Sequence, residues 1–282
     1  MQSIQRVFSF GLAALLCMLV AACASAPRES PPVALEPLRL SADQELAFDR
    51  VLILTDASSS MYAHSPAQAR ALTQSMVAGL PDRSTGVQVG AMAFGGSDRR
   101  SVPIALVDRA QLLAFAKSIQ PMGGISGPRN GERHGGTTPL DDVFDEAAQQ
   151  LRGGSGRAAV ILISDGAATL PDRASAAARR LIAEHPAGDL CLFTVRLGDS
   201  AKGGQLARQV SDLSGCGSSI SAERLRTAGS FGTYRDSIFA MQVPSLPAVA
   251  AAPPCETRLN LSNIEFAFDR ANLTASGQAE VA

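Results

Sequence analysis

Four short runs of aliphatic residues, separated by stretches with helical character, constrain this chain more than any other feature. The runs are VLILT (51–55), GVQVGAMAF (86–94), AAVILIS (158–164) and LCLFTVRLG (190–198). Strands that alternate with helices of about 10–15 residues form βαβ units with a parallel sheet, and continuously apolar strands are covered on both faces. The sequence therefore predicts an α/β fold, a doubly wound and mostly parallel sheet with helices on both faces.

The stretches between these runs contain the predicted helices. They occupy residues 66–80, 140–151, 173–185 and 203–213. A further run, RSVPIALV (100–107), contains a proline and follows the turn-forming sequence GGSDRR. Because proline cannot donate a hydrogen bond to a central strand ladder, this run is predicted to be an edge strand.

Changes in composition predict the domain organisation. The α/β pattern occupies residues 47–242, and residues 23–46 are rich in proline and polar residues, which is typical of a tether. Residues 243–254 contain four prolines and no charge, which indicates a linker. The last 28 residues, 255–282, begin a new strand and helix pattern but are too few to bury a core. They are predicted to be the start of an incomplete second domain.

The first 22 residues predict the compartment. One arginine precedes an apolar stretch, residues 7–22, which is too short for a comfortable membrane span and is typical of a signal peptide. The stretch ends in AAC, which resembles a bacterial lipobox with Cys23 as the lipidated first residue of the mature chain; a secretory signal cleaved near Ala26 is the alternative. The residue after this cysteine is Ala24 rather than aspartate, which resembles lipoproteins that are sorted to the outer membrane. The protein would then face the periplasm or the cell surface.

Export makes disulfide bonds possible. Cys191 begins an apolar strand and Cys216 follows the next predicted helix, so a return to a neighbouring strand would bring the two thiols together. Such a bridge would close a loop of about 25 residues and contribute about 3 kcal/mol. Two buried thiols are the alternative, and Cys255 is left without a predicted partner.

Polar residues follow two of the predicted strands. Asp56 ends VLILT and Asp165 ends VILIS, so both carboxylates are expected at the carboxyl edge of the sheet, where ligands of open parallel sheets bind. Ser58 and Ser60 lie two and four residues after Asp56, so in an extended chain the three side chains point the same way. Hydroxyl and carboxylate oxygens are hard ligands that suit Mg²⁺, Mn²⁺ or Ca²⁺.

Three separated motifs resemble the metal-ion-dependent adhesion site of von Willebrand factor A (vWA) domains. The motifs are Asp56-x-Ser58-x-Ser60, Gly135-Gly136-Thr137 and Ser164-Asp165-Gly166, and the resemblance covers residues 47–242. It implies a ligand set of Asp56, Ser58, Ser60, Thr137 and Asp165. It also implies a divalent cation, Mg²⁺ first with Mn²⁺ and Ca²⁺ as alternatives, and a protein partner that offers an acidic side chain as a further ligand. Thr138 is the alternative to Thr137, and ordinary turns and helix caps are the alternative to a metal site.

The segment PMGGISGPRNGERHGG (121–136) follows the third predicted strand region and is basic and rich in glycine. It is either a solvated loop or a specificity loop that steers acidic partners. His134 in this segment is not expected to bind the metal, because the other ligands are hard oxygens. His64 and His185 are expected at the surface.

The last residues, IEFAFDRANLTASGQAEVA, resemble the first strand and helix start of the OmpA-type C-terminal domain, which binds peptidoglycan. The match rests on Phe266, Phe268, Asp269, Leu273 and Gly277. The resemblance implies a link to peptidoglycan if the domain is complete. The residues that contact peptidoglycan in that family lie beyond the match, so no site is assigned here.

These features together predict a non-enzymatic lipoprotein of the cell envelope that binds a protein partner through a metal. A serine hydrolase is disfavoured because no Gly-x-Ser-x-Gly motif occurs. A structural scaffold with a vestigial metal site is the other alternative. A net charge of -1 without a long basic run argues against nucleic-acid binding.

Overall fold

The structure is a computed structural model that describes residues 31–58, 60–61, 66–122, 137–186 and 188–243. Contacts divide the chain into two units, Met1–Gln242 and Val243–Ala282, and every described helix and strand belongs to the first. The predicted signal peptide, Cys23 with the tether up to residue 30, residues 244–254 of the linker and residues 255–282 lie outside the described residues. None of the helices in the described ranges is both long and apolar enough to cross a membrane.

A six-stranded sheet forms the centre of the first unit, with the strand order β4-β3-β2-β5-β6-β7. The strands are β2 (Arg50–Asp56), β3 (Gln88–Gly95), β4 (Asp98–Leu106), β5 (Ala158–Ser164), β6 (Leu190–Arg196) and β7 (Ser218–Ser221). All neighbours are parallel except β4, which pairs antiparallel with β3 at the edge of the sheet. The predicted mostly parallel α/β sheet and its proline-containing edge strand are confirmed.

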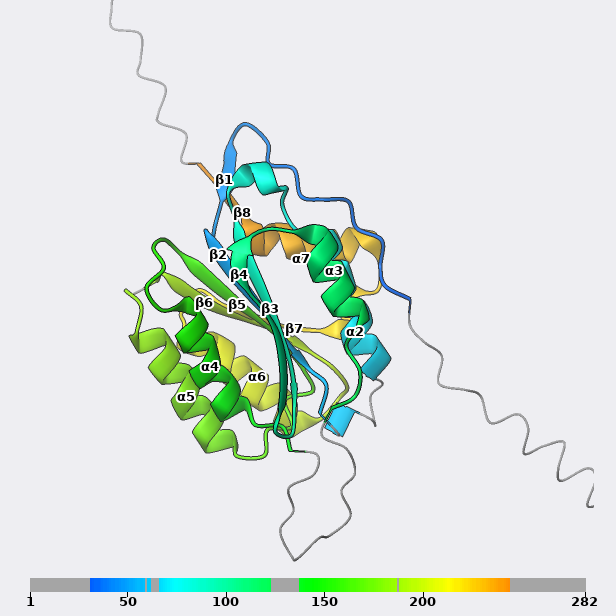
Figure 1. Cartoon of the computed structure of the whole chain (residues 1–282), viewed down its shortest axis with the longest axis vertical. Helices are drawn as coiled ribbons and strands as arrows, with labels where there is room; N and C mark the ends of the chain where they lie inside the picture. Colours follow the sequence, from blue (N-terminus) through cyan, green and yellow to red (C-terminus); the bar gives the residue numbers. More distant parts are fainter. Residues whose placement is uncertain (1–30, 59, 62–65, 123–136, 187, 244–282) are drawn as a thin grey trace, which may run out of the picture. The chain divides into compact units, whose positions relative to one another are not determined.

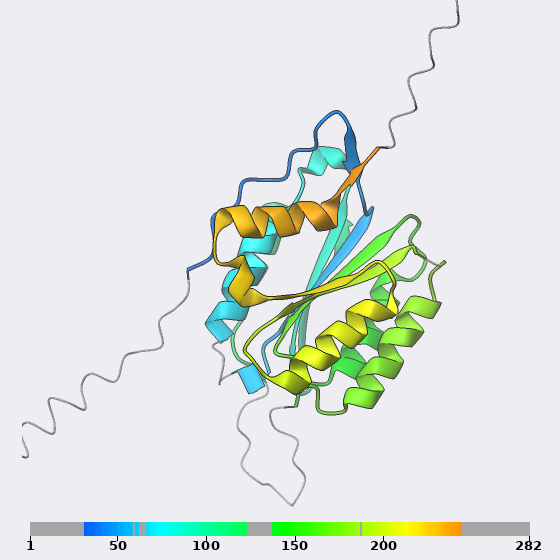
Figure 2. The ribbon, with the colours of Figure 1, turned by 180° about the vertical axis from the view of Figure 1, so that it is seen from behind.

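Helices cover both faces of this sheet (Figures 1 and 2). The helices are α2 (Pro66–Ala78), α3 (Arg109–Lys117), α4 (Leu140–Leu151), α5 (Pro171–Ala183), α6 (Ala201–Leu213) and α7 (Ala228–Phe239), with short 3-10 turns η2 (Arg83–Thr85) and η3 (Ala222–Leu225). In β2, Val51 and Ile53 pack in the core beneath α2, α3 and α7, whereas Leu52 and Leu54 pack beneath α4, α5 and α6. This alternation follows from the two-residue period of a strand, and it explains why the strand is apolar throughout.

Residues 31–40, which we call the strap, pack along α2 instead of extending away from the domain. Leu38 is only 5% exposed, and its N–H donates a hydrogen bond of 3.2 Å to the carbonyl of Gly79, just after α2. Nearer the N-terminus, the N–H of Val33 donates to the Ser75 hydroxyl at 2.8 Å. The sequence predicts a tether over residues 23–46, but its described part is held by apolar packing and hydrogen bonds to α2.

A small antiparallel ribbon joins the two ends of the domain. Strand β1 (Gln44–Leu46) pairs with β8 (Ala240–Gln242), which follows directly after α7. Since β1 lies four residues before β2 begins at Arg50, the ribbon lies beside the amino ends of the central strands (Figure 1).

The predicted disulfide is present. It joins Cys191, the second residue of β6, to Cys216, which lies between α6 and β7, with 5.3 Å between the two Cα atoms. Cys191 is 1% exposed, so the bond connects the segment before the edge strand β7 to the buried strand β6.

Candidate metal centre

The two predicted aspartates lie at the same edge of the sheet. Strands β2 and β5 are parallel neighbours, with Thr55 paired to Ile163, so Asp56 and Asp165 follow at adjacent strand ends. Both carboxylates are buried, with 0% and 2% of their surface exposed. The buried strands therefore deliver two acidic groups to one rim of the domain.

Three hydroxyl groups meet beside these carboxylates. The Ser58 Oγ lies 3.1 Å from the Ser60 Oγ and 2.8 Å from the Thr138 Oγ1. The remaining side of the triangle, from Ser60 Oγ to Thr138 Oγ1, is 3.2 Å. Two segments that are about 80 residues apart in the sequence thus present three oxygens to one point.

The threonine whose hydroxyl lies at this triangle is Thr138, the alternative to the predicted Thr137. The backbones of the two threonines make hydrogen bonds to different neighbours, and these bonds fix which hydroxyl points to the serines. The Thr137 carbonyl accepts a hydrogen bond of 2.9 Å from the N–H of Gly96 in the β3–β4 turn. Thr138 is 2% exposed and turns its hydroxyl to the serines, whereas Thr137 is partly exposed.

Thr169, in the loop between β5 and α5, holds the backbone of Thr138 by two hydrogen bonds. The Thr138 N–H donates to the Thr169 Oγ1 at 2.9 Å, and the Thr169 N–H donates to the Thr138 carbonyl at 3.1 Å. The loop that starts at Asp165 is therefore connected to the third hydroxyl. The sequence analysis did not identify this residue, and no short-range pattern marks it.

The Asp56 carboxylate is oriented by a donor at each oxygen. Oδ1 accepts from the N–H of Ser58 at 2.9 Å, and Oδ2 accepts from the Ser164 hydroxyl at 2.6 Å. The Ser164 Oγ in turn accepts from the N–H of Gly166 at 3.0 Å. Ser164 was part of the Ser-Asp-Gly motif in the sequence, but its role as a donor to Asp56 depends on the pairing of β2 with β5.

Burial makes the negative charge of Asp56 costly. It raises the pKa of this carboxyl from 3.8 to about 6, an effect that the hydrogen bonds from Ser164 and Ser58 oppose and that the nearby Asp165 charge increases. Among the described residues, the charged group that acts on Asp56 is this second carboxylate. Two buried carboxylates side by side favour a cation of charge +2 between or above them.

Close backbone approaches at glycine hold the segments of the site together. A Cβ on Gly95, at the end of β3, would lie 2.9 Å from the Cα and N of Ser58. A Cβ on Gly203, in the first turn of α6, would overlap the carbonyl oxygen of Asp165. The absence of a side chain at these two positions allows the Ser58 and Asp165 turns to pack against their neighbours.

The oxygens of the site fit a small divalent cation. Neighbouring ligands of an octahedral Mg²⁺ at about 2.0–2.1 Å lie about 2.9 Å apart. The three hydroxyl oxygens are spaced 2.8–3.2 Å apart, close to the spacing of one face of that octahedron. Across the described residues, no group of three or more His, Cys, Asp or Glu could hold a metal. The oxygens that meet at this edge are three hydroxyls beside two carboxylates.

Other predicted features lie at the margin of this site or away from it. Residues 123–136, with Gly135, Gly136 and His134, and also Ser59 and His64, lie outside the described residues. The described start of that segment is attached to the site, because the N–H of Met122 donates to the Ala57 carbonyl at 2.7 Å. His185 lies two residues after the end of α5, where its Nδ1 is 3.0 Å from the Leu181 carbonyl oxygen.

Comparison with known proteins finds similarity in structure. No protein family and no curated sequence matches the chain. The vWF domain of the type V pili tip protein Mfa5 from Porphyromonas gingivalis is similar, with a TM-score of 0.51, 12% identity, and coverage of 67% of this chain and 94% of that domain. Manganese-loaded TRAP protein from Plasmodium vivax has a TM-score of 0.48 and 18% identity over 70% of this chain and 77% of its own.

Proximal thread matrix protein 1 from the mussel byssus is also similar, with a TM-score of 0.46 and 16% identity over 69% of this chain. The present chain spans 48% of the length of that mussel protein. At these identities the comparisons bear on the fold. The described domain has the vWA-type α/β fold, a mixed, mostly parallel sheet of six strands between two layers of helices.

Proposed function

We propose that this domain binds a protein partner through a divalent cation, Mg²⁺ in the first instance. The observation that carries this proposal is the triangle of Ser58, Ser60 and Thr138 hydroxyls beside two buried carboxylates. Hydroxyl oxygens without sulfur or imidazole suit Mg²⁺, Mn²⁺ or Ca²⁺. The spacing of the three hydroxyls supports a site in which they are the protein oxygens nearest the ion.

The two aspartates would compensate the charge of the cation. Asp56 is held by Ser58 and Ser164, so it can act behind the hydroxyls without changing its orientation. When bound, the cation supplies a Lewis-acidic position for an oxygen ligand from outside the domain. For a carboxylate about 4 Å from one unit of positive charge, the attractive Coulomb energy is about 1 kcal/mol in water and about 4 kcal/mol at an effective dielectric constant of 20. The partner is therefore expected to offer an aspartate or glutamate.

A calorimetric titration of the mature chain with MgCl₂ tests metal binding. We expect saturable binding to the wild-type protein and at least a tenfold weaker affinity for Ser60→Ala, because an outer oxygen of the triangle is lost. Ser97→Ala, which removes an exposed hydroxyl from the β3–β4 turn, is the matched control and should bind like wild type. Equal affinity of wild type and Ser60→Ala would exclude the triangle as the metal site.

The partner is tested separately from the metal. Envelope proteins captured by the wild-type chain in MgCl₂ should be released by EDTA and should not be captured by Ser60→Ala. A partner retained equally by wild type and Ser60→Ala, with or without EDTA, would favour a structural scaffold that does not use the cation.

We also propose that the chain is an outer-membrane lipoprotein attached at Cys23, with a link to peptidoglycan through the segment that begins at residue 255. Support comes from the lipobox-like sequence before Cys23 and from the OmpA-like residues between 264 and 277. Mass spectrometry of the mature N-terminus should find a lipid-modified cysteine at position 23, and Cys23→Ser should move the protein from the membrane to the soluble fraction. An unmodified mature N-terminus near Ala26 would contradict the anchor.

A further inference from the structure

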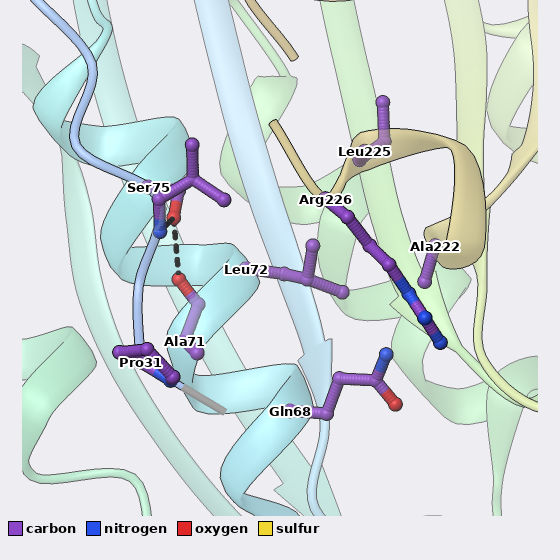
Figure 3. Close-up of a pocket in the computed structure, with 9 residues that line it drawn as sticks. Pro31, Gln68, Ala71, Leu72, Ser75, Ala222, Leu225 and Arg226 are labelled. Carbon is purple, nitrogen blue, oxygen red and sulfur yellow. Dashed lines mark hydrogen bonds between the residues drawn. The ribbon is translucent and has the colours of Figure 1, made fainter. Parts of the chain in front are cut away.

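The strap turns the entering chain back toward the metal edge of the domain. Leu38 contacts the end of α2 through the Gly79 carbonyl, and Val33 contacts Ser75 one turn earlier in the helix. Pro31 lines a pocket of about 360 Å³ together with Gln68, near the beginning of α2. Figure 3 shows Pro31 beside the first turns of this helix. The strap is thus antiparallel to α2, and its first described residue lies near the start of the helix.

The start of α2 lies on the same side of the domain as the metal centre. The helix begins at Pro66, only a few residues after Ser60 and Met61. From Gly79 back to Gln68 the helix rises about 16 Å, at about 1.5 Å per residue. The strap therefore shifts the entry of the chain by about that length from the β1–β8 ribbon toward the hydroxyl triangle.

The chain leaves the described domain at the other end. Strand β8 ends at Gln242 and pairs with β1, at the amino end of β2, whereas Asp56 lies at the carboxyl end of β2. A seven-residue strand spans about 20 Å. Without the strap, the chain would enter and leave the domain at the β1–β8 ribbon. The strap moves the point of entry away from the point of exit, along the direction of the central strands.

The hydrogen bonds and burial along the strap show that this path is held in place. In addition to the bonds of Leu38 and Val33, the guanidinium of Arg235 in α7 donates to the Glu36 carbonyl at 2.5 Å. Leu38 is buried in the same core as α2 and α7, and Leu35 packs against that core. Contacts to two helices therefore attach the strap to the domain.

We propose that the strap directs the metal edge toward the membrane that holds the lipid on Cys23, so that the acidic partner is a protein of that membrane surface. This inference rests on the proposed lipid anchor. Eight residues, 23–30, lie before Pro31, and covalent geometry limits their reach to at most about 28 Å. The amino end of the sheet lies about 20 Å farther from Pro31 than the metal edge does. To bring the amino end to the membrane, the tether would have to run back along the whole domain.

Energy transfer to lipids tests this orientation with a matched pair of positions on one strand. Ser155 and Ala167 are exposed and lie three residues before and three residues after β5, at opposite ends of the sheet. The variants Ser155→Cys and Ala167→Cys are made in a full-length Cys255→Ser background, labelled with a donor dye, and reconstituted in phosphatidylethanolamine–phosphatidylglycerol vesicles with a headgroup-attached acceptor. Because the ends of the strand are about 20 Å apart, we expect transfer from position 167 to exceed transfer from position 155 by about twofold or more.

A second variant isolates the effect of the strap. Insertion of a Gly/Ser segment of about 20 residues between Ser30 and Pro31 lengthens the tether without changing the domain, and it should remove the difference between the two positions. Equal transfer from both positions, or stronger transfer from position 155, in the protein without the insertion would overturn the proposal.

Failure of this inference can be told apart from failure of the functions on which it depends. The mass of the N-terminal peptide reports whether Cys23 is lipidated, and an unlipidated, unbound protein would overturn the anchor and the orientation together. Metal binding is read independently, since Ser60→Ala should weaken it and leave the difference in energy transfer unchanged. Transfer that depends on Ser60 would show that the metal site, rather than the strap, determines the orientation.

Discussion

The Ser164 hydroxyl donates a hydrogen bond of 2.6 Å to the Asp56 carboxylate and so connects the last residues of the two central strands. Asp56 ends β2 and Ser164 ends β5, and the other carboxylate oxygen accepts the N–H of Ser58. With both oxygens engaged, the carboxylate cannot rotate freely toward solvent. It is therefore held in one orientation beside the hydroxyl triangle.

Thr138→Val should weaken Mg²⁺ binding by about tenfold or more, because it removes one of three converging oxygens while conserving the shape of the side chain. Thr137→Val is the matched control, since Thr137 contacts the β3–β4 turn through its backbone carbonyl, which the substitution leaves in place. Calorimetric titration of both variants compares the two adjacent threonines directly. A larger loss for Thr137→Val than for Thr138→Val would show that Thr137 is the metal ligand.

Asp56→Asn should stabilise the metal-free protein at pH 7.5. Burial raises the pKa of Asp56 to about 6, so between about pH 4 and pH 6 the folded chain retains a proton that the unfolded chain has lost. The free energy of unfolding therefore falls as the pH rises through this window, by up to about 3 kcal/mol for a shift of this size. The substitution should recover about 1–3 kcal/mol at pH 7.5 and little at pH 4.

Chemical denaturation in EDTA at the two pH values measures this effect. Asp199→Asn, at an exposed position, is the matched control and should change the free energy of unfolding little at either pH, because its charge remains in water. A stabilisation of Asp56→Asn that is equal at pH 4 and pH 7.5 would contradict the proposed cost of burying the charge.

Thr169→Val should weaken Mg²⁺ binding by about tenfold, although Thr169 lies outside the hydroxyl triangle. Valine cannot accept the hydrogen bond from the Thr138 N–H, so the backbone that positions the third hydroxyl loses one of its two links to the β5–α5 loop. Thr169→Ser keeps the acceptor and should restore the affinity. If serine and valine reduce the affinity equally, the methyl group rather than the hydrogen bond determines the effect.

Gly203→Ala should destabilise the protein by about 1–3 kcal/mol and weaken metal binding, because the new methyl group would overlap the Asp165 carbonyl oxygen. Gly232→Ala is the matched helical control. A Cβ at Gly232 meets no atom within 4 Å, so alanine should stabilise α7 by about 0.5–1 kcal/mol. Thermal melts with and without MgCl₂ measure both effects, and similar stabilisation by the two substitutions would exclude close packing at Asp165.

Removing the disulfide by Cys191→Ala with Cys216→Ala should lower the free energy of unfolding by about 3 kcal/mol, because the bond closes a loop with a sequence separation of 25 residues. Denaturant titration of oxidised wild type, reduced wild type and the double variant measures the loss. The reduced protein and the double variant should agree within the cost of the small cavity at Cys191. An unchanged unfolding midpoint would show that the closed loop contributes little to stability.

The sequence predicts some helices and misses others for identifiable reasons. Helix α4 has apolar residues at helical spacing, and all six of its buried residues lie on one face. Helix α7 has the sequence AGSFGTYRDSIF, with two glycines and weak helical preference, and it was not predicted. Its stability comes from burial of Phe231, Tyr234, Ile238 and Phe239 against the core and from a capping box at Thr227, which local pattern alone did not reveal.

The amino-acid sequence by itself determined the parallel α/β sheet and the edge at which Asp56, Ser58, Ser60 and Asp165 gather. Both follow from local rules, since apolar runs specify buried strands and parallel strands end at a common edge. Only the tertiary structure decided that Thr138 rather than Thr137 completes the hydroxyl triangle, that Ser164 and Thr169 position the site, and that residues 31–40 return along α2. These outcomes depend on strand register, on backbone hydrogen bonds between distant loops and on burial of Leu38, which arise when segments far apart in the chain pack together.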